Sequence, residues 1–129
     1  MHEDGLARFV TPQPRTRFGE NLADDRRRKK TLERLDHFGD LDARYATKVS
    51  TNQQGAESLR AALRSSGATT ECHVVSSDRT LDVQTLTLDQ ALAAVEGSEF
   101  GTFLSCLPGK LAYFHGETRD ERYLLQRPE

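Results

Sequence analysis

Apolar and polar residues follow their clearest pattern in the last third of the chain, in the stretch 101–117. Two runs of mostly apolar residues flank Pro108 and Gly109, which predicts a β-hairpin with a tight turn. Counting outward from a two-residue turn predicts the facing pairs Cys106–Leu111, Ser105–Ala112, Leu104–Tyr113, Phe103–Phe114 and Thr102–His115. Because L-proline followed by glycine favours a type II turn, which fits a two-residue hairpin poorly, this register is open to a shift.

Both faces of this hairpin are apolar near the turn. A strand with one face in water alternates apolar with polar residues, and these two strands do not. Either helices cover one face and the N-terminal segment covers the other, or part of one face is an interface. The candidate interface residues are Phe103, Leu104, Tyr113 and Phe114, together with Phe18 from the N-terminal segment.

The pattern in the rest of the body, residues 42–129, predicts further strands and two helices. In chain order these are a strand at 43–49, a helix that ends at Gly67, strands at 69–77 and 82–87, a helix at 88–96 and a last strand at 122–126. Thr87 and Gln90 have the spacing of a capping box at the start of the second helix, and Gly97 stops it.

This order of elements predicts an α+β fold. We expect a single mixed, mostly antiparallel sheet of about five to six strands with two helices packed on it, plus an N-terminal helix and an extended arm. Because a helix connects the first two strands, one parallel pairing is expected between them.

The N-terminal region differs in character from the body. Pro12 and Pro14 favour a polyproline-like conformation, so residues 1–20 are expected to form an extended, flexible arm. Residues 21–38 are rich in helix formers and predict a charged helix. The domain organisation is therefore the arm, 1–20, followed by a single domain, 21–129.

Composition narrows the class of protein. The chain has 129 residues, of which 36% are hydrophobic and 29% charged, and its net charge is −2. This composition fits one globular domain. Its small net negative charge gives no long-range electrostatic attraction toward nucleic acid or anionic membranes. No apolar run approaches the ~20 residues that span a bilayer. The N-terminus lacks the basic segment followed by an apolar segment that is typical of a secretory signal. Two cysteines cannot form a disulfide framework, so a cytoplasmic protein with reduced thiols is expected.

The strongest charge feature is the basic run Arg26, Arg27, Arg28, Lys29 and Lys30. Such a run can bind the phosphates of RNA or DNA. It can equally be a solvated helix face, because acidic residues lie at i,i+4 from several of these cations. Residues 1–41 carry nine Lys and Arg against eight Asp and Glu, a sum of +1. Since no aromatic residue interrupts the run for base stacking, the solvated face is favoured.

Catalytic candidates are few: Cys106, His73 and His115. Within the hairpin, Cys106 and His115 are about 13 Å apart along the strand, which is too far for a dyad. Cys106 with His73 needs adjacent strands, and the alternative is that both cysteines are buried apolar residues. Acidic residues that could assist lie at strand ends: Asp78, Asp82, Glu117, Asp120 and Glu121. No spacing predicts a metal site, a cofactor or a known catalytic motif.

These observations leave three functional hypotheses. The favoured one is a small non-enzymatic protein-binding or regulatory module that acts through an interface, with a second copy of the chain among its candidate partners. An alternative is a small enzyme with a pocket at the strand ends that uses Cys106 or His73 with nearby carboxylates. The third is an RNA- or DNA-binding accessory protein that uses the basic run 26–30.

Overall fold

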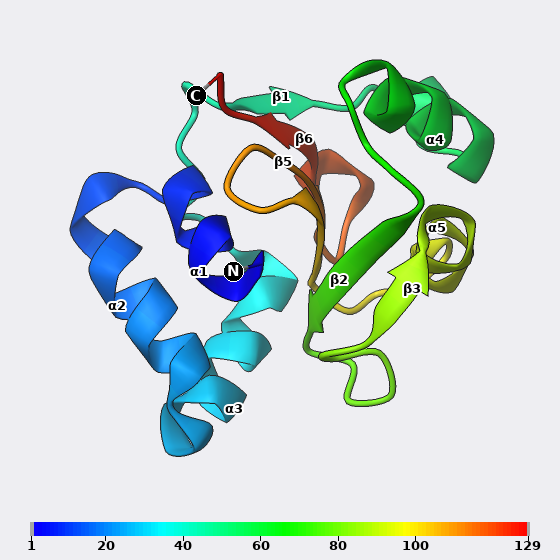
Figure 1. Cartoon of the computed structure of the whole chain (residues 1–129). Coiled ribbons are helices and arrows are strands. Elements are labelled where there is room, and N and C mark those ends of the chain that lie inside the picture. The colour runs from blue at the N-terminus through cyan, green and yellow to red at the C-terminus, as the bar shows by residue number, and fades with distance from the viewer. Residues whose placement is uncertain (1, 129) are drawn as a thin grey trace.

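The computed structural model describes residues 2–128, and for residues 12–16 the backbone alone. It contains one six-stranded antiparallel sheet and helices, which confirms the α+β fold (Figure 1). Across the sheet the strands are β1 (Ala46–Lys48), β6 (Arg122–Gln126), β5 (Leu111–His115), β4 (Thr102–Leu107), β2 (Glu71–Ser76) and β3 (Thr85–Thr87). The expected parallel pairing is wrong, because β1 pairs with β6 and lies at the opposite end of the sheet from β2 and β3.

The hairpin forms with four of the five predicted pairs, from Thr102–His115 to Ser105–Ala112. Beside the turn the register shifts, so that Leu107 instead of Cys106 faces Leu111. The Lys110 N–H donates to the Leu107 carbonyl at 3.0 Å, and Gly109 has a φ of 71°. This positive φ at the third position of the turn, directly after proline, is that of a type II turn. A type II turn fits the twist of the two strands poorly, and the register shift at Cys106 compensates for this misfit.

Two helices cover one face of the sheet. They are α4 (Ala56–Ser65), which follows the short helix η3 (Thr51–Gln53), and α5 (Leu88–Val95) (Figure 1). The predicted capping box at the start of α5 is confirmed, because Thr87 and Gln90 bond each other's backbone N–H. Apolar side chains of α4 and α5 pack on the sheet residues of this face, among them Cys72, Val74, Leu104, Cys106 and Tyr113.

Residues 2–41, which we call the N-terminal layer, cover the other face (Figure 1). The elements are α1 (His2–Leu6), η1 (Ala7–Phe9), α2 (Pro12–Ala23), α3 (Asp25–Glu33) and η2 (Arg34–His37). The extended arm is therefore wrong: Pro12 starts a helix, where its missing N–H is not needed. The single helix at 21–38 is wrong too, since Asp24 accepts hydrogen bonds from the backbone N–H groups of Arg26 and Arg27 and starts a new helix.

The two layers explain why both faces of the hairpin are apolar. Phe103 and Phe114 pack against Phe18 and Phe38 of the N-terminal layer, with ring centroids 5.8 to 5.9 Å apart. On the other face, Leu104 and Tyr113 lie beneath α4 and α5. All five candidate interface residues are thus buried inside the chain, because its own helices cover both faces of the sheet.

Candidate functional site

The structure separates Cys106 from His73. Cys106 lies on the face covered by α4 and α5, whereas His73 faces the N-terminal layer and bonds Glu3 at 2.9 Å. Successive residues of a strand point to opposite faces, and His73 lies opposite Ser105 in the register, so the neighbouring Cys106 points away from it. The cysteine–histidine dyad between these strands is therefore wrong.

Both cysteines are buried and free. A hydrogen bond with Cys72, together with burial, raises the pKa of the Cys106 thiol. Since the thiolate is the nucleophilic form, a buried thiol with a raised pKa is a poor nucleophile. Their environment is that of small apolar core residues.

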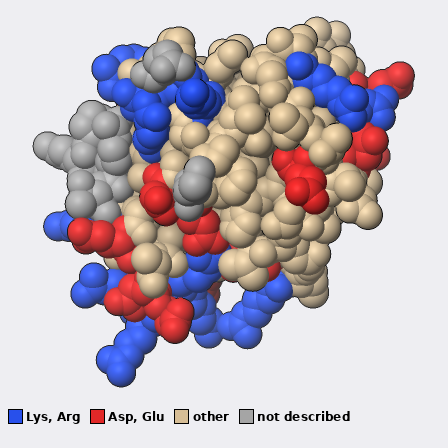
Figure 2. Space-filling model, viewed as in Figure 1, with Lys and Arg blue, Asp and Glu red and all other residues tan. Residues whose placement is uncertain are grey.

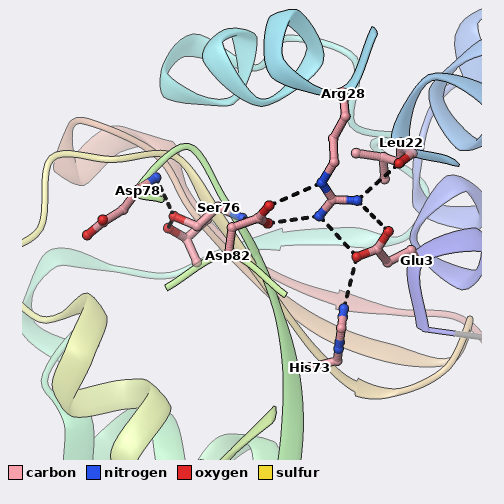
Figure 3. A network of polar contacts seen from close by, with 8 residues as sticks. Glu3, Leu22, Arg28, His73, Ser76, Asp78 and Asp82 are labelled. Carbon is pink, nitrogen blue, oxygen red and sulfur yellow. Dashed lines mark hydrogen bonds and ion pairs between the residues drawn. The ribbon is translucent and has the colours of Figure 1, made fainter. Parts of the chain in front are cut away.

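His73 belongs to a network of charged groups between the N-terminal layer and the sheet (Figure 3). Arg28 is its centre: the guanidinium donates to both carboxylate oxygens of Glu3, at 2.6 and 3.0 Å, and to both of Asp82, at 2.9 and 3.1 Å. It also donates to the Leu22 carbonyl at 3.0 Å. Asp82 in turn accepts from the Ser76 backbone N–H. This network joins α1, α3 and the β2–β3 connection.

The electrostatics of the network favour its charged form. Burial alone would raise the pKa of Glu3, but hydrogen bonds from His73 and Arg28 outweigh it and lower that pKa to about 2. Next to it, the rings of His2 and His73 stack at 5.6 Å. Burial, and then the charge of His73, lower the pKa of His2. These fully bonded groups hold the layer in place.

The basic run does not form a continuous positive surface. Its central residue, Arg28, is withdrawn into the network, while Arg26, Arg27, Lys29 and Lys30 are exposed on α3. Figure 2 shows acidic side chains interspersed with basic ones over the N-terminal helices on the viewed face. Interspersed charges of both signs are typical of a solvated surface.

Among the catalytic candidates, His73 lines a pocket of about 360 Å³ beside His2 and Glu3, and His115 lines a larger pocket. We call it the strand-end pocket: it has a volume of about 730 Å³ and lies between the start of α4, the end of α5 and the connection from β5 to β6. Leu59, Leu92 and Val95 provide apolar lining. Its polar lining includes Tyr113, His115, Gln54, Ser98, Glu96 and Arg122.

Tyr113 and His115 form a hydrogen-bonded pair in this pocket. Because a carbonyl can only accept, the contact of His115 Nε2 with the Ser98 carbonyl at 3.0 Å makes Nε2 the donor. In the neutral ring Nδ1 then accepts from the Tyr113 hydroxyl at 3.1 Å. Burial, assisted by the nearby charge of Arg122, lowers the pKa of His115 to about 4. Burial raises the pKa of Tyr113 to about 12. Both groups are therefore neutral at pH 7.

Arg122 is brought beside this pair by the sheet, because it lies directly opposite His115 in the pairing of β5 with β6. Its Nε–H donates to the Gly116 carbonyl at 3.2 Å and its Nη1–H donates to Gln54 Oε1 at 3.3 Å. No described carboxylate lies within ion-pair distance of it. Gln54 is held in turn, since its amide donates to the carbonyls of Val49 and Arg119.

The acidic candidates at the strand ends are all engaged elsewhere. Asp82 belongs to the Arg28 network, and Asp78 accepts from the Thr80 hydroxyl. The others have partners at the surface: Glu117 and Glu121 contact the His37 ring, at 2.5 and 3.6 Å, and Asp120 forms an ion pair with Lys48 at 3.6 Å. Only Glu117 of the five lines the strand-end pocket.

Sequence reasoning found His115 but missed Arg122 and Gln54. Tyr113 and His115 are two residues apart on one strand, so their shared face was readable from the sequence. Arg122 and Gln54 come from a strand and a loop whose neighbours are decided by the pairing of β6 with both β5 and β1. No local signal marks those neighbours.

Comparisons add no further assignment. Among the described residues, no helix has the length and apolar character needed to cross a membrane. Nor does this part of the chain gather three or more His, Cys, Asp and Glu side chains in a way suited to a metal ion. The chain matches no protein-family model, no curated protein and no solved structure.

Proposed function

We propose that the protein is a non-enzymatic binding module and that its ligand site is the strand-end pocket. The observation that carries this proposal is the half-buried Arg122, which has no carboxylate partner among the described residues and lines a pocket of about 730 Å³. Pockets of this size with apolar walls and a few fixed polar groups are typical ligand sites. This proposal keeps the non-enzymatic module expected from the sequence but replaces the expected protein interface at the hairpin with a ligand pocket.

The bonding of the reactive groups favours binding over catalysis. A general base needs a free lone pair within reach of its substrate, and both ring nitrogens of His115 are already bonded. A cysteine nucleophile needs an accessible thiolate, and Cys106 is buried with a raised pKa. These groups therefore contribute shape and polarity more readily than proton transfer.

A screen of small organic fragments, followed by amide chemical shifts, tests the proposal. We expect fragment-induced shifts to gather around the pocket, at Leu59, Ser98 and His115. The exposed Thr51 lines the pocket, so Thr51→Trp should obstruct it and abolish these shifts. Thr85→Trp, at an exposed position of β3, is the control and should leave them unchanged. Fragments that bind elsewhere, or none at all, would rule the site out.

A second candidate function is supported by Phe100. It is 47% exposed, and it lines a smaller pocket of about 260 Å³ together with Lys29 and Arg79. The sequence argument against nucleic acid was the lack of an aromatic residue among the cations, and the fold brings one there from a distant segment. An exposed ring in the same pocket as two cations suits a base and its phosphates, whereas Glu33 and Asp36, which also line this pocket, oppose phosphate binding.

Fluorescence anisotropy with a labelled 20-residue oligo-dT tests this second candidate. If it is correct, binding at low salt should weaken steeply as salt increases, and Phe100→Ala should reduce it. Val83→Ala, at the other exposed large apolar side chain of the described residues, is the matched control. No change in anisotropy at low salt would exclude this function.

A further inference from the structure

We infer that the strand-end pocket recognises a singly charged carboxylate on an apolar body, with the guanidinium of Arg122 as its anchor. This inference rests on the proposed function and specifies its ligand.

The first argument is the unbalanced charge of Arg122. Arg28, which is also half-buried, is paired with two carboxylates, whereas the acceptors of Arg122 among the described residues are neutral oxygens, among them those of Gly116 and Gln54. Charged side chains that leave water are usually paired, because an uncompensated charge is costly to desolvate. An incoming carboxylate would supply the missing charge.

The second argument is that Arg122 is held in a fixed orientation. Its Nε and Nη1 each donate to an acceptor, and Gln54 is itself anchored by two backbone carbonyls. A guanidinium in a fixed orientation can offer its remaining N–H groups to both oxygens of a carboxylate. Preorganised donors lose little entropy when the ligand binds, which favours this contact further.

The third argument concerns the other charges around the pocket. His115 is neutral at pH 7, so Arg122 is the cation beside the buried Tyr113–His115 pair. Glu96, Glu99 and Glu117 also line the pocket, and Glu96 accepts from the N–H of Ala56 at the start of α4. These acids would repel a multiply charged anion more strongly than a singly charged one. They therefore favour a carboxylate over a phosphate.

The fourth argument is the apolar lining. Leu59, Leu92 and Val95 line the same pocket as Arg122, from α4 and α5. Burying apolar surface against them would add to the affinity for an organic acid but not for a small inorganic anion. The ligand class is therefore an organic carboxylate with an aliphatic or aromatic body.

Matched pairs of probes test this inference on the full chain by amide chemical-shift titration. The pairs are benzoate with benzamide and hexanoate with hexanamide, which keep shape and remove charge. We expect each acid to bind in the pocket at least about tenfold more tightly than its amide, because a charge-assisted bidentate contact is lost in the amide. Inorganic phosphate, the third arm, should bind more weakly than either acid.

Variants assign the effect to one residue. Arg122→Gln should remove the preference for the acid, and Arg122→Lys should retain part of it, because lysine keeps the charge but not the planar fork. Arg64→Gln is the control: Arg64 is exposed on α4 and does not line the pocket, so its loss should change the acid affinity by no more than about threefold. If a variant does not fold, the comparison of acid with amide in the unaltered protein still shows whether the pocket prefers a carboxylate.

The outcomes separate this inference from the proposed function. Amides that bind as tightly as the acids, phosphate that binds more tightly, or an acid preference that survives Arg122→Gln would overturn the carboxylate assignment while leaving the pocket as a binding site. If neither these probes nor any fragment shifts the pocket amides, the proposed function fails, and the carboxylate assignment fails with it.

Discussion

Val83 has a backbone conformation that its side chain does not favour. Its φ is 62°, in the left-handed region, and its side chain is 59% exposed. The Val83 N–H donates to the Val74 carbonyl at 2.8 Å, and the Val74 N–H donates to the Gln84 carbonyl at 2.9 Å. Val83 and Gln84 therefore both face Val74, as in a β-bulge whose left-handed position is usually glycine. This conformation is strained for a β-branched residue, and the exposed side chain of Val83 buries no surface that would offset the strain.

We expect Val83→Asn to stabilise the protein by about 1 kcal/mol, because asparagine tolerates the left-handed region and little buried area is lost. Val83→Gly should stabilise it less, since glycine also increases the entropy of the unfolded chain. Urea denaturation at pH 7 measures both. Val83→Thr keeps the branched Cβ and is the control; a gain of the same size in that variant would show that strain is not the cause.

His115 links the pocket to the pH dependence of stability. Its pKa falls from 6.5 to about 4 on folding, so the unfolded chain binds the proton more tightly between these values. The contribution of the neutral ring is therefore complete above about pH 6.5 and is lost as the pH falls to about 4, by about 3 kcal/mol in total. His2, whose pKa is also lowered, adds to the loss in the same direction.

The variant His115→Gln should flatten this dependence. Glutamine is always neutral, so the free energy of unfolding should fall less between pH 7 and pH 4.5 than in the unaltered protein, although the variant is less stable at pH 7. Urea denaturation across this pH range provides the comparison. Equal slopes for both proteins would mean that the folded state does not disfavour the charged imidazole.

At the scale of elements, the N-terminal layer is fastened to the sheet by the Arg28 network. The side chains of Arg28, Glu3 and Asp82 are only 16%, 25% and 14% exposed. They come from α3, α1 and the β2–β3 connection, which are far apart in the sequence. Removal of the cation leaves two half-buried carboxylates with only the partners His73 and the Ser76 N–H, and this cost exceeds the worth of the ion pairs themselves.

We expect Arg28→Met to destabilise the protein by about 3 kcal/mol at pH 7. Arg28→Lys should lose less, because a single ammonium can still neutralise the carboxylates but cannot bridge both bidentately. The adjacent Arg27 is the matched control: it is 67% exposed, and Arg27→Met should cost less than about 0.5 kcal/mol. Thermal or urea unfolding gives all three values, and equal effects at positions 27 and 28 would contradict the assignment.

At the scale of the whole molecule, the sheet is the middle of three layers. Its residues on the side of the N-terminal layer include Val75, Phe103, Phe114 and Leu125, all with no exposed surface. Each such large side chain contributes roughly 1.5–3 kcal/mol by leaving water. A domain is stable by only about 5–15 kcal/mol in total, so neither half of this core is dispensable.

A chain that starts at Asp42 lacks the N-terminal layer and should not fold cooperatively. The reason is that one apolar face of the sheet would be in water. Circular dichroism during urea titration, together with binding of a hydrophobic dye, measures the effect. Addition of the peptide 1–41 should restore part of the structure; a sharp transition of the shortened chain alone would contradict the expectation.

The full chain, by contrast, is expected to be a monomer. The apolar residues that suggested an interface are internal, and the strands at the two edges, β1 and β3, have three residues each. Short edge strands offer little for pairing with another sheet. Light scattering after size exclusion tests this at micromolar concentration, and a stable dimer would return attention to the exposed Phe100 and Val83.

Local patterns predicted much of the fold. The strand at 122–126, the capping box at Thr87 and the four hairpin pairs rest on alternation and capping between residues close in the sequence. The N-terminal region was predicted less well. Proline suits both an extended arm and a first helical turn, and the sequence around Pro12 does not distinguish these two uses.

The amino-acid sequence by itself determined the class of fold, the positions of most elements and the presence of two apolar faces on the hairpin, because these depend on spacing and on neighbouring residues. Only the tertiary structure decided what covers those faces, which cations are paired and which polar groups meet in a pocket. Strand order and layer packing bring together Arg28 with Glu3 and Asp82, and Arg122 with His115. Such long-range neighbours leave no periodic signal along the chain.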